Sequence, residues 1–113
     1  MIEFKVDDGC LFIDGEAVRL PFPVVEAIGI DAAVAVRVDV PTGQAFNRNV
    51  YLIDAERRIL WQIDESPHGT EADKPFMNIW MADDEALMAG NWNGIDYVVD
   101  ISSGRLSVKA FRR

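Results

Sequence analysis

The stretch Ala33-Val34-Ala35-Val36-Arg37-Val38-Asp39-Val40 decides the fold class of this chain. Every second residue is a valine, and alanine, arginine or aspartate stands between the valines. Successive side chains of a β-strand point to opposite faces, so a period of two is typical of a strand with one face in a core. The stretch therefore predicts such a strand.

The same period recurs along most of the chain, for example over residues 2–6 and 59–63. Short turn signals separate these runs. They are Asp14-Gly15, Asp31-Ala32, Ala55-Glu56-Arg57, Asn93-Gly94 and Ser102-Ser103-Gly104.

The best candidate for a helix is the segment from Val24 to Ala33, but Gly29 and several β-branched residues disfavour more than one helical turn there. We therefore predict a single all-β domain over residues 1–113. It is expected to be an antiparallel meander of about nine short strands, with little or no helix. A sandwich and a propeller-blade-like stack are both compatible with this pattern.

The composition narrows the classes of protein to which the chain can belong. It has 113 residues, half of them hydrophobic, and a formal net charge of -8. A chain of this length forms one domain, and it is too apolar to be disordered. Its acidity argues against binding to nucleic acid or to an anionic membrane surface. Charges recur near the N-terminus and no long apolar segment is present, so we expect a cytoplasmic protein.

Few residues could support catalysis. Cys10 is the only cysteine and His68 the only histidine, and we expect a buried small hydrophobe and a solvated loop residue, respectively. The sequence has no catalytic-triad context, zinc-ligand set or phosphate-binding glycine loop. Asp83-Asp84-Glu85 lacks the alternating spacing of a calcium loop. We predict no metal, no cofactor and no enzymatic activity; catalysis by a pair of carboxylates is the alternative ranked last.

The chain contains an internal repeat. Tyr51-Leu52-Ile53-Asp54 is similar to Tyr97-Val98-Val99-Asp100, and Leu11-Phe12-Ile13-Asp14 is a fainter copy. In each copy a strand ends in aspartate, whose carboxylate can accept backbone N–H groups of the following turn. The repeat therefore predicts several hairpins of one design.

The segment Asp100-Ile101-Ser102-Ser103-Gly104-Arg105 resembles the D-x-x-[ST]-G-[KR] turn of quinoprotein-type β-propeller repeats. The stretch from Tyr51 to Trp61 is similar to the same repeat, with Trp61 as its docking tryptophan. Three copies are fewer than the roughly four to eight blades that close a propeller. The resemblance therefore implies a shared hairpin pattern and carries over no quinone-binding residue.

A second resemblance is to a group of small, single-domain bacterial proteins. It is carried by Phe22-Pro23-Val24, Asn49-Val50-Tyr51, Ile59-Leu60-Trp61-Gln62-Ile63, Asn91-Trp92-Asn93-Gly94 and Tyr97. The resemblance implies an all-β fold and a bacterial source, and it implies no activity.

Aromatic and amide side chains crowd into residues 75–81 and 90–97, directly after an acidic loop at residues 64–75. The loop is either functional or a solvated excursion between strands. On a regular strand Phe76, Asn78 and Trp80 share one face, and Trp92 emerges beside a turn at a sheet end. The predicted binding residues are Phe76, Asn78, Trp80, Asn91, Trp92, Asn93 and Tyr97. The alternative is that all three tryptophans are core residues.

The first functional hypothesis from the sequence is a non-enzymatic protein-interaction module whose net charge of -8 attracts a basic partner. An immunity-type inhibitor of a basic bacterial toxin is its sharpest form. Self-association through the Trp80 face or through an open sheet edge is a less specific form. The alternative function is a β domain that binds a sugar or another small ligand through its Trp, Asn and Tyr side chains.

Overall fold

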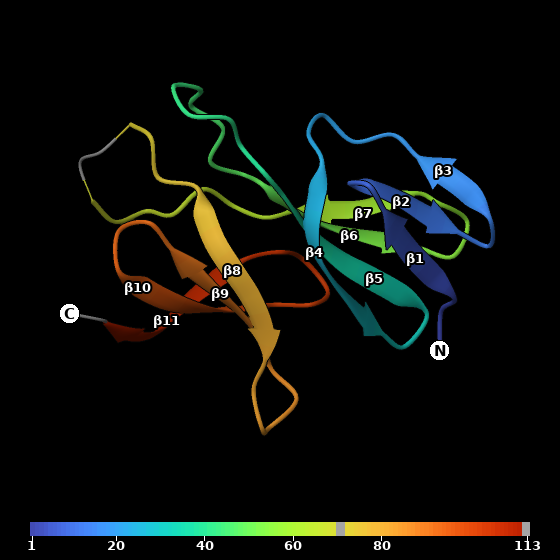
Figure 1. Ribbon diagram of the computed structural model, residues 1–113. Coiled ribbons are helices and arrows are strands. Elements are labelled where there is room, and N and C mark those ends of the chain that lie inside the picture. Colours follow the sequence, from blue (N-terminus) through green and yellow to red (C-terminus); the bar gives the residue numbers. More distant parts are fainter. Residues whose placement is uncertain (70–71, 112–113) are drawn as a thin grey trace.

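The computed structural model of the protein describes residues 1–69 and 72–111, which form eleven strands in three antiparallel sheets and no helix (Figure 1). The first sheet, in the order β1-β2-β3, consists of β1 (Phe4–Asp7), β2 (Cys10–Ile13) and β3 (Glu16–Val18). The middle sheet, in the order β4-β5-β6-β7, consists of β4 (Val24–Ile30), β5 (Ala33–Val38), β6 (Val50–Asp54) and β7 (Ile59–Gln62). The third sheet, in the order β11-β10-β9-β8, consists of β8 (Phe76–Met81), β9 (Leu87–Asn91), β10 (Ile95–Val99) and β11 (Leu106–Phe111).

The all-β prediction is confirmed, with more strands than the roughly nine that the turn signals suggested. The segment that was the best helix candidate forms β4 and the turn after it. None of the described residues belongs to a helix with the length and apolarity needed to cross a membrane.

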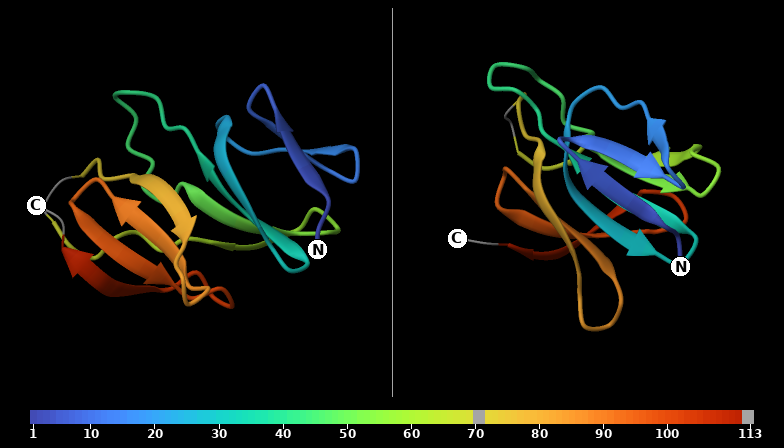
Figure 2. Two further views of the ribbon diagram at one scale, coloured as in Figure 1. Left: turned by 60° about the horizontal axis from the view of Figure 1, so that its bottom comes forward. Right: turned by 45° about the vertical axis from the view of Figure 1, so that its right-hand side comes forward.

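The two central strands of the middle sheet, β5 and β6, are buried on both faces, because the first and third sheets lie on either side of them (Figures 1 and 2). On β5, Val34, Val36 and Val38 face the hydrophobic cluster shared with the first sheet. Ala33 and Ala35 face the cluster shared with the third sheet. The prediction that this stretch has only one face in a core is therefore wrong, because a second sheet covers the alanine face.

The predicted turns lie where the sequence placed them. Asp14 and Gly15 connect β2 to β3 with φ angles of 51° and 80°, the left-handed pair that a type I′ hairpin turn requires. Asp31, with φ of 52°, turns the chain between β4 and β5. Gly94, with φ of 86°, closes a three-residue connection from β9 to β10.

The two clear copies of the internal repeat occupy equivalent positions, since β6 and β10 are each the third strand of a four-stranded meander. Asp54 Oδ1 accepts the backbone N–H groups of Glu56 and Arg58, both at 2.9 Å. Asp100 Oδ1 accepts the backbone N–H of Ser102 at 2.9 Å and the Ser102 hydroxyl at 2.7 Å. These contacts confirm the expected role of the two aspartates.

The hydrogen bonds also lower the pKa of both carboxyl groups. The backbone N–H of Arg58 is the main cause of the lowered pKa of Asp54. The hydroxyl of Ser102 is the main cause of the lowered pKa of Asp100. Both aspartates are therefore bound more strongly by their turns as carboxylates than as carboxylic acids.

Trp61 of β7 docks on the turn that follows β10. Its indole Nε1–H donates a hydrogen bond of 2.6 Å to the carbonyl of Ile101. The ring lies over Gly104, where a Cβ atom would be only 2.8 Å from Trp61 Cε3. Gly104 also has φ of 78°, a conformation that side chains disfavour. The turn of the third sheet thus needs a glycine both for its backbone and for the tryptophan of the middle sheet.

We expect Gly104→Ala to lower the free energy of unfolding by more than Gly15→Ala. Gly15 has a similar φ of 80°, but nothing lies within 4 Å of its added Cβ. Gly15→Ala should therefore cost only the left-handed backbone penalty of about 1–2 kcal/mol. Gly104→Ala adds the clash with Trp61, for about 1–3 kcal/mol more. Urea denaturation measures both values, and equal losses would contradict the docking contact.

We expect Asp100→Ala to lower the melting temperature at pH 7 and to do so less as the pH falls below 3.8, the ordinary pKa of the group. The pKa of Asp100 is lower in the folded state, so the folded state binds fewer protons than the unfolded state. Its stabilisation is therefore complete above the ordinary pKa and is lost as the pH falls through the folded pKa. Melting curves of the wild type, Asp100→Ala and the exposed control Asp83→Ala test this. A wild-type advantage that persists unchanged at pH 2 would argue against it.

Candidate functional site

The structure divides the seven predicted binding residues between core and surface. Phe76, Asn91 and Tyr97 are buried, Trp80 and Asn93 are half-buried, and Asn78 and Trp92 are exposed. The accessible part of the predicted surface is therefore smaller than the sequence suggested. Binding through these residues stays a prediction. The buried ones could contribute only by holding the exposed ones in place, because they cannot contact a partner themselves.

A β-bulge separates Phe76 from Asn78 and Trp80. Phe76 pairs with Asn91 and Asn78 pairs with Gly90, so Met77 is an extra residue in β8. Phe76 therefore points into the core, while Asn78 is exposed and Trp80 is half-buried. The prediction that the three side chains share one face is wrong, because the bulge shifts the alternation by one residue.

The three tryptophans have three different environments. Trp61 is a core residue with 7% of its surface exposed. Trp80 is half-buried and pairs across the sheet with Met88. Trp92 is 60% exposed, at the end of the third sheet between β9 and β10, and its backbone N–H donates to the carbonyl of Pro75 at 3.0 Å. The expectation that Trp92 emerges at a sheet end is confirmed.

A hollow of about 260 Å³ lies beside Trp92, and we call it the Trp92 hollow. Trp92 and Met77, which is 46% exposed, form apolar parts of its wall. The polar and charged residues of the lining are Arg37, Asp39, Thr42, Gln44, Asn49 and Asp73. The hollow therefore combines an exposed aromatic ring with carboxylates and amide groups from several segments of the chain.

Buried hydrogen bonds hold the strand ends that form the Trp92 hollow. The Asn49 side chain is buried, and its Oδ1 accepts the backbone N–H of Phe76 at 2.8 Å. Its Nδ2 donates to the carbonyls of Phe76 at 2.9 Å and Val38 at 3.2 Å. This single amide ties the end of β5 to the start of β8, so these two strand ends are held together beside the hollow.

The lining of the Trp92 hollow has an excess of negative charge. The guanidinium of Arg37 is bound to Glu26 across the sheet, with 2.5 Å between Nε and Oε1. Asp39 and Asp73 are exposed, and no residue in ranges 1–69 and 72–111 forms an ion pair with either of them. The two carboxylates are thus free to attract a positive charge from outside.

A polar network that the sequence did not predict holds the start of the acidic loop against the third sheet. The hydroxyl of Tyr97 lies 2.5 Å from Ser66 Oγ and 2.9 Å from His68 Nδ1. Asn93 Nδ2 donates to Ser66 Oγ at 2.8 Å and to the His68 carbonyl at 3.2 Å. Lys74 Nζ donates to the same carbonyl at 3.2 Å. No local sequence motif predicts these contacts, because Ser66 and Tyr97 are far apart in sequence.

Tyr97 is the centre of this network, because its hydroxyl contacts both Ser66 and His68, and the tautomer of the histidine sets which group donates in each contact. The amide of Asn93 donates to the same serine oxygen. His68 is exposed as expected, but its ring is bound to Tyr97 rather than free in solvent. Ser66 has only 2% of its surface exposed, and the imidazole contacts the phenol rather than the serine hydroxyl. The network therefore anchors the loop; Thr70 and Glu71 of that loop lie outside the described residues.

We expect Tyr97→Phe to destabilise the protein by about 1–3 kcal/mol, because it removes the phenol to which the buried Ser66 hydroxyl and the His68 ring are hydrogen-bonded. Tyr51→Phe is the matched control, since Tyr51 occupies the equivalent strand and, among residues 1–69 and 72–111, its hydroxyl accepts just one long hydrogen bond, of 3.4 Å from Gln62. We expect that control to cost under about 1 kcal/mol. Urea denaturation measures both, and limited proteolysis should cut residues 64–69 faster in Tyr97→Phe alone. Equal effects of the two substitutions would rule out the anchoring role.

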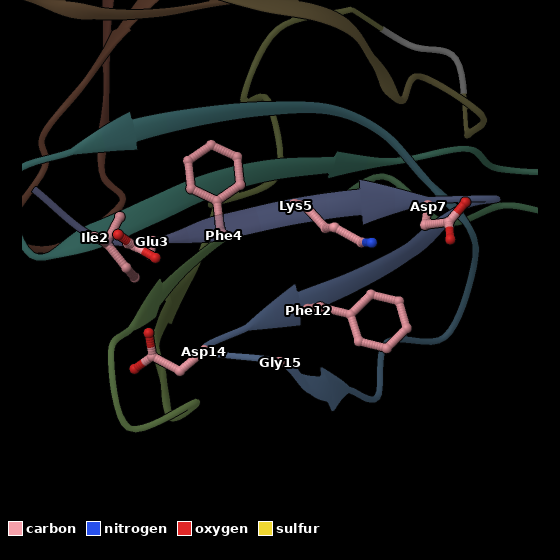
Figure 3. Close-up of a pocket in the computed structure, with 8 residues that line it drawn as sticks. All are labelled: Ile2, Glu3, Phe4, Lys5, Asp7, Phe12, Asp14 and Gly15. Atoms are coloured by element: carbon pink, nitrogen blue, oxygen red, sulfur yellow. The ribbon is translucent and has the colours of Figure 1, made fainter.

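A wider hollow of about 520 Å³ lies on the first sheet, and Figure 3 shows its lining. Lys5 and Phe12 pair across β1 and β2 and both line it, and Glu3 and Asp14 lie at the same end of the lining (Figure 3). Phe4 points away from Phe12 toward the middle sheet, and both rings are half-buried. This hollow offers no fully exposed aromatic ring, so the Trp92 hollow is the better candidate for a binding site.

Other chemistry has little support among residues 1–69 and 72–111. No three His, Cys, Asp or Glu side chains in this part of the chain are grouped so that they could hold a metal ion. Cys10 is half-buried rather than fully buried, and its Sγ lies 3.9 Å from the carbonyl of Leu11.

Comparison with known proteins shows the family and nothing more specific. No curated protein and no solved structure matches the chain. The family described as Domain of unknown function (DUF7957) matches residues 1–111, and the chain therefore belongs to this family.

Proposed function

We propose that this protein is a non-enzymatic interaction module that binds another protein through Trp92, Met77 and the Trp92 hollow. The observation that carries the proposal is that Trp92 has 60% of its surface exposed, whereas Trp61 of the same domain has only 7% exposed. Tryptophan is among the residues most enriched at the energetic centres of protein interfaces. An exposed ring beside a hollow whose strand ends are held together by Asn49 provides such a centre without reorganisation of the fold.

The charge of the protein supports a basic partner. A net charge of -8 attracts a positively charged protein over a distance and speeds its association. In its specific form we propose an immunity-type inhibitor of a basic bacterial toxin, acting in the bacterial cytoplasm. The burial of Ser66 and its bond to Tyr97 support a role without catalysis, because the serine nearest to the histidine is occupied.

A second candidate function is the binding of a sugar or another small ligand in the same place. The observation that favours it is the combination of the Trp92 ring with Asp39 and Gln44 in one hollow. A flat aromatic ring stacks on a sugar, and carboxylate and amide groups bond to its hydroxyls. A neutral sugar would use the carboxylates as hydrogen-bond acceptors but would leave their negative charge without a counter-charge.

We expect Trp92→Ala to weaken binding of the natural partner about 30-fold or more, as the loss of an interface centre does. The fold should be unaffected, since the ring is exposed. Leu60→Ala is the control, because Leu60 is 53% exposed on β7 and lies outside the lining of the Trp92 hollow. Immobilised wild type, Trp92→Ala and Leu60→Ala are compared for the proteins they retain from the source cell. If Trp92→Ala retains the same proteins as Leu60→Ala, the proposed surface is not used.

A further inference from the structure

We infer that the Trp92 hollow receives an arginine side chain of the partner. This inference rests on the proposed function, because it assumes that the Trp92 surface binds a protein. The first support is charge. Asp39 and Asp73 line the hollow without an ion pair in the described part of the chain, and the lining residue Arg37 is already bound to Glu26. A cation from outside finds two carboxylates there, whereas an anion is repelled.

The second support is the exposed indole of Trp92. Tryptophan is the aromatic side chain that attracts cations most strongly over its ring face. A guanidinium is planar, so it can stack on the ring while its N–H groups point toward a carboxylate. An ammonium group is a compact charge that cannot stack in this way. The combination of ring and carboxylates therefore favours arginine over lysine.

The third support is the apolar wall that Met77 provides. In a regular strand, alternation would turn Met77 to the side opposite Asn78, into the core. The bulge in β8 instead leaves it 46% exposed in the lining of the hollow. The aliphatic stem of an arginine can pack against such a side chain while its charged end reaches the carboxylates. The backbone N–H of Trp92 donates to the Pro75 carbonyl, and this hydrogen bond holds Trp92 beside the start of β8.

The experiment uses the whole protein and a capped peptide, acetyl-Gly-Gly-Arg-Gly-Gly-amide, as the probe. Its companions contain citrulline, which has the shape of arginine without the charge, or lysine. The signal is the nuclear magnetic resonance shift of the Trp92 indole N–H during titration. We expect a saturable shift with the arginine peptide, a weaker response to lysine, and binding of the citrulline peptide reduced about tenfold or more.

Two double variants with the same net charge test the carboxylates. Asp39→Asn with Asp73→Asn removes the charges that line the hollow. Asp83→Asn with Asp84→Asn removes two charges from the exposed connection between β8 and β9. We expect the first variant to bind the arginine peptide about tenfold more weakly and the second to bind it as the wild type does. All four side chains are exposed, so both variants should keep the melting behaviour of the fold.

Several results would overturn the inference. They are equal binding of the citrulline and arginine peptides, equal behaviour of the two double variants, and absence of any shift with the arginine peptide. A shift produced by cellohexaose but not by arginine would instead assign the hollow to a sugar. If the Asp39 and Asp73 variant still retains the natural partner while Trp92→Ala loses it, the arginine inference fails alone. If Trp92→Ala also retains the partner, the proposed function fails.

Discussion

The burial of β5 and β6, the central strands of the middle sheet, on both faces is the constraint on which the rest of the structure depends. β5 turns valines toward the first sheet and alanines toward the third, so one strand contributes to two cores. Three side chains of the middle sheet or its connections then bond to the backbone of the third sheet or the turn after β10. Asn49 bonds to Phe76, Glu26 accepts the N–H of Ile79 at 3.1 Å, and Trp61 donates to Ile101. Hydrophobic burial brings the sheets together, and these directional bonds fix how they are placed.

The Trp92 hollow is a consequence of this docking. The bond between Asn49 and Phe76 brings the start of β8 to the end of β5, which places Met77 and Asp39 in one lining. The bulge after Phe76 lets β8 bury that ring and expose the next side chain. Two successive residues of β8 therefore have different roles: Phe76 packs in the core, and Met77 is exposed at the surface. Tyr97 in turn anchors the start of the loop that precedes Asp73.

The features that could be predicted from the sequence are those that depend on neighbouring residues. The Asp14-Gly15 turn follows from local backbone preferences, and the roles of Asp54 and Asp100 follow from hydrogen bonds within their own turns. The burial of Asn91 and Tyr97 and the bond of His68 to Tyr97 could not be predicted. They depend on strands and loops that are distant in the sequence, and no local signal records such contacts.

The sequence by itself determined an all-β meander, the positions of its turns and a strongly acidic surface, because strand alternation, turn chemistry and charge are local properties. Only the tertiary structure decided which tryptophan is core, which is half-buried and which is exposed. Alternation shows that a strand has two faces, but it does not show whether another sheet covers the second face. A bulge changes the parity of every residue beyond it. For these two reasons the tertiary structure, rather than the periodicity, separated Phe76 from Trp80 and left Trp92 beside an open hollow.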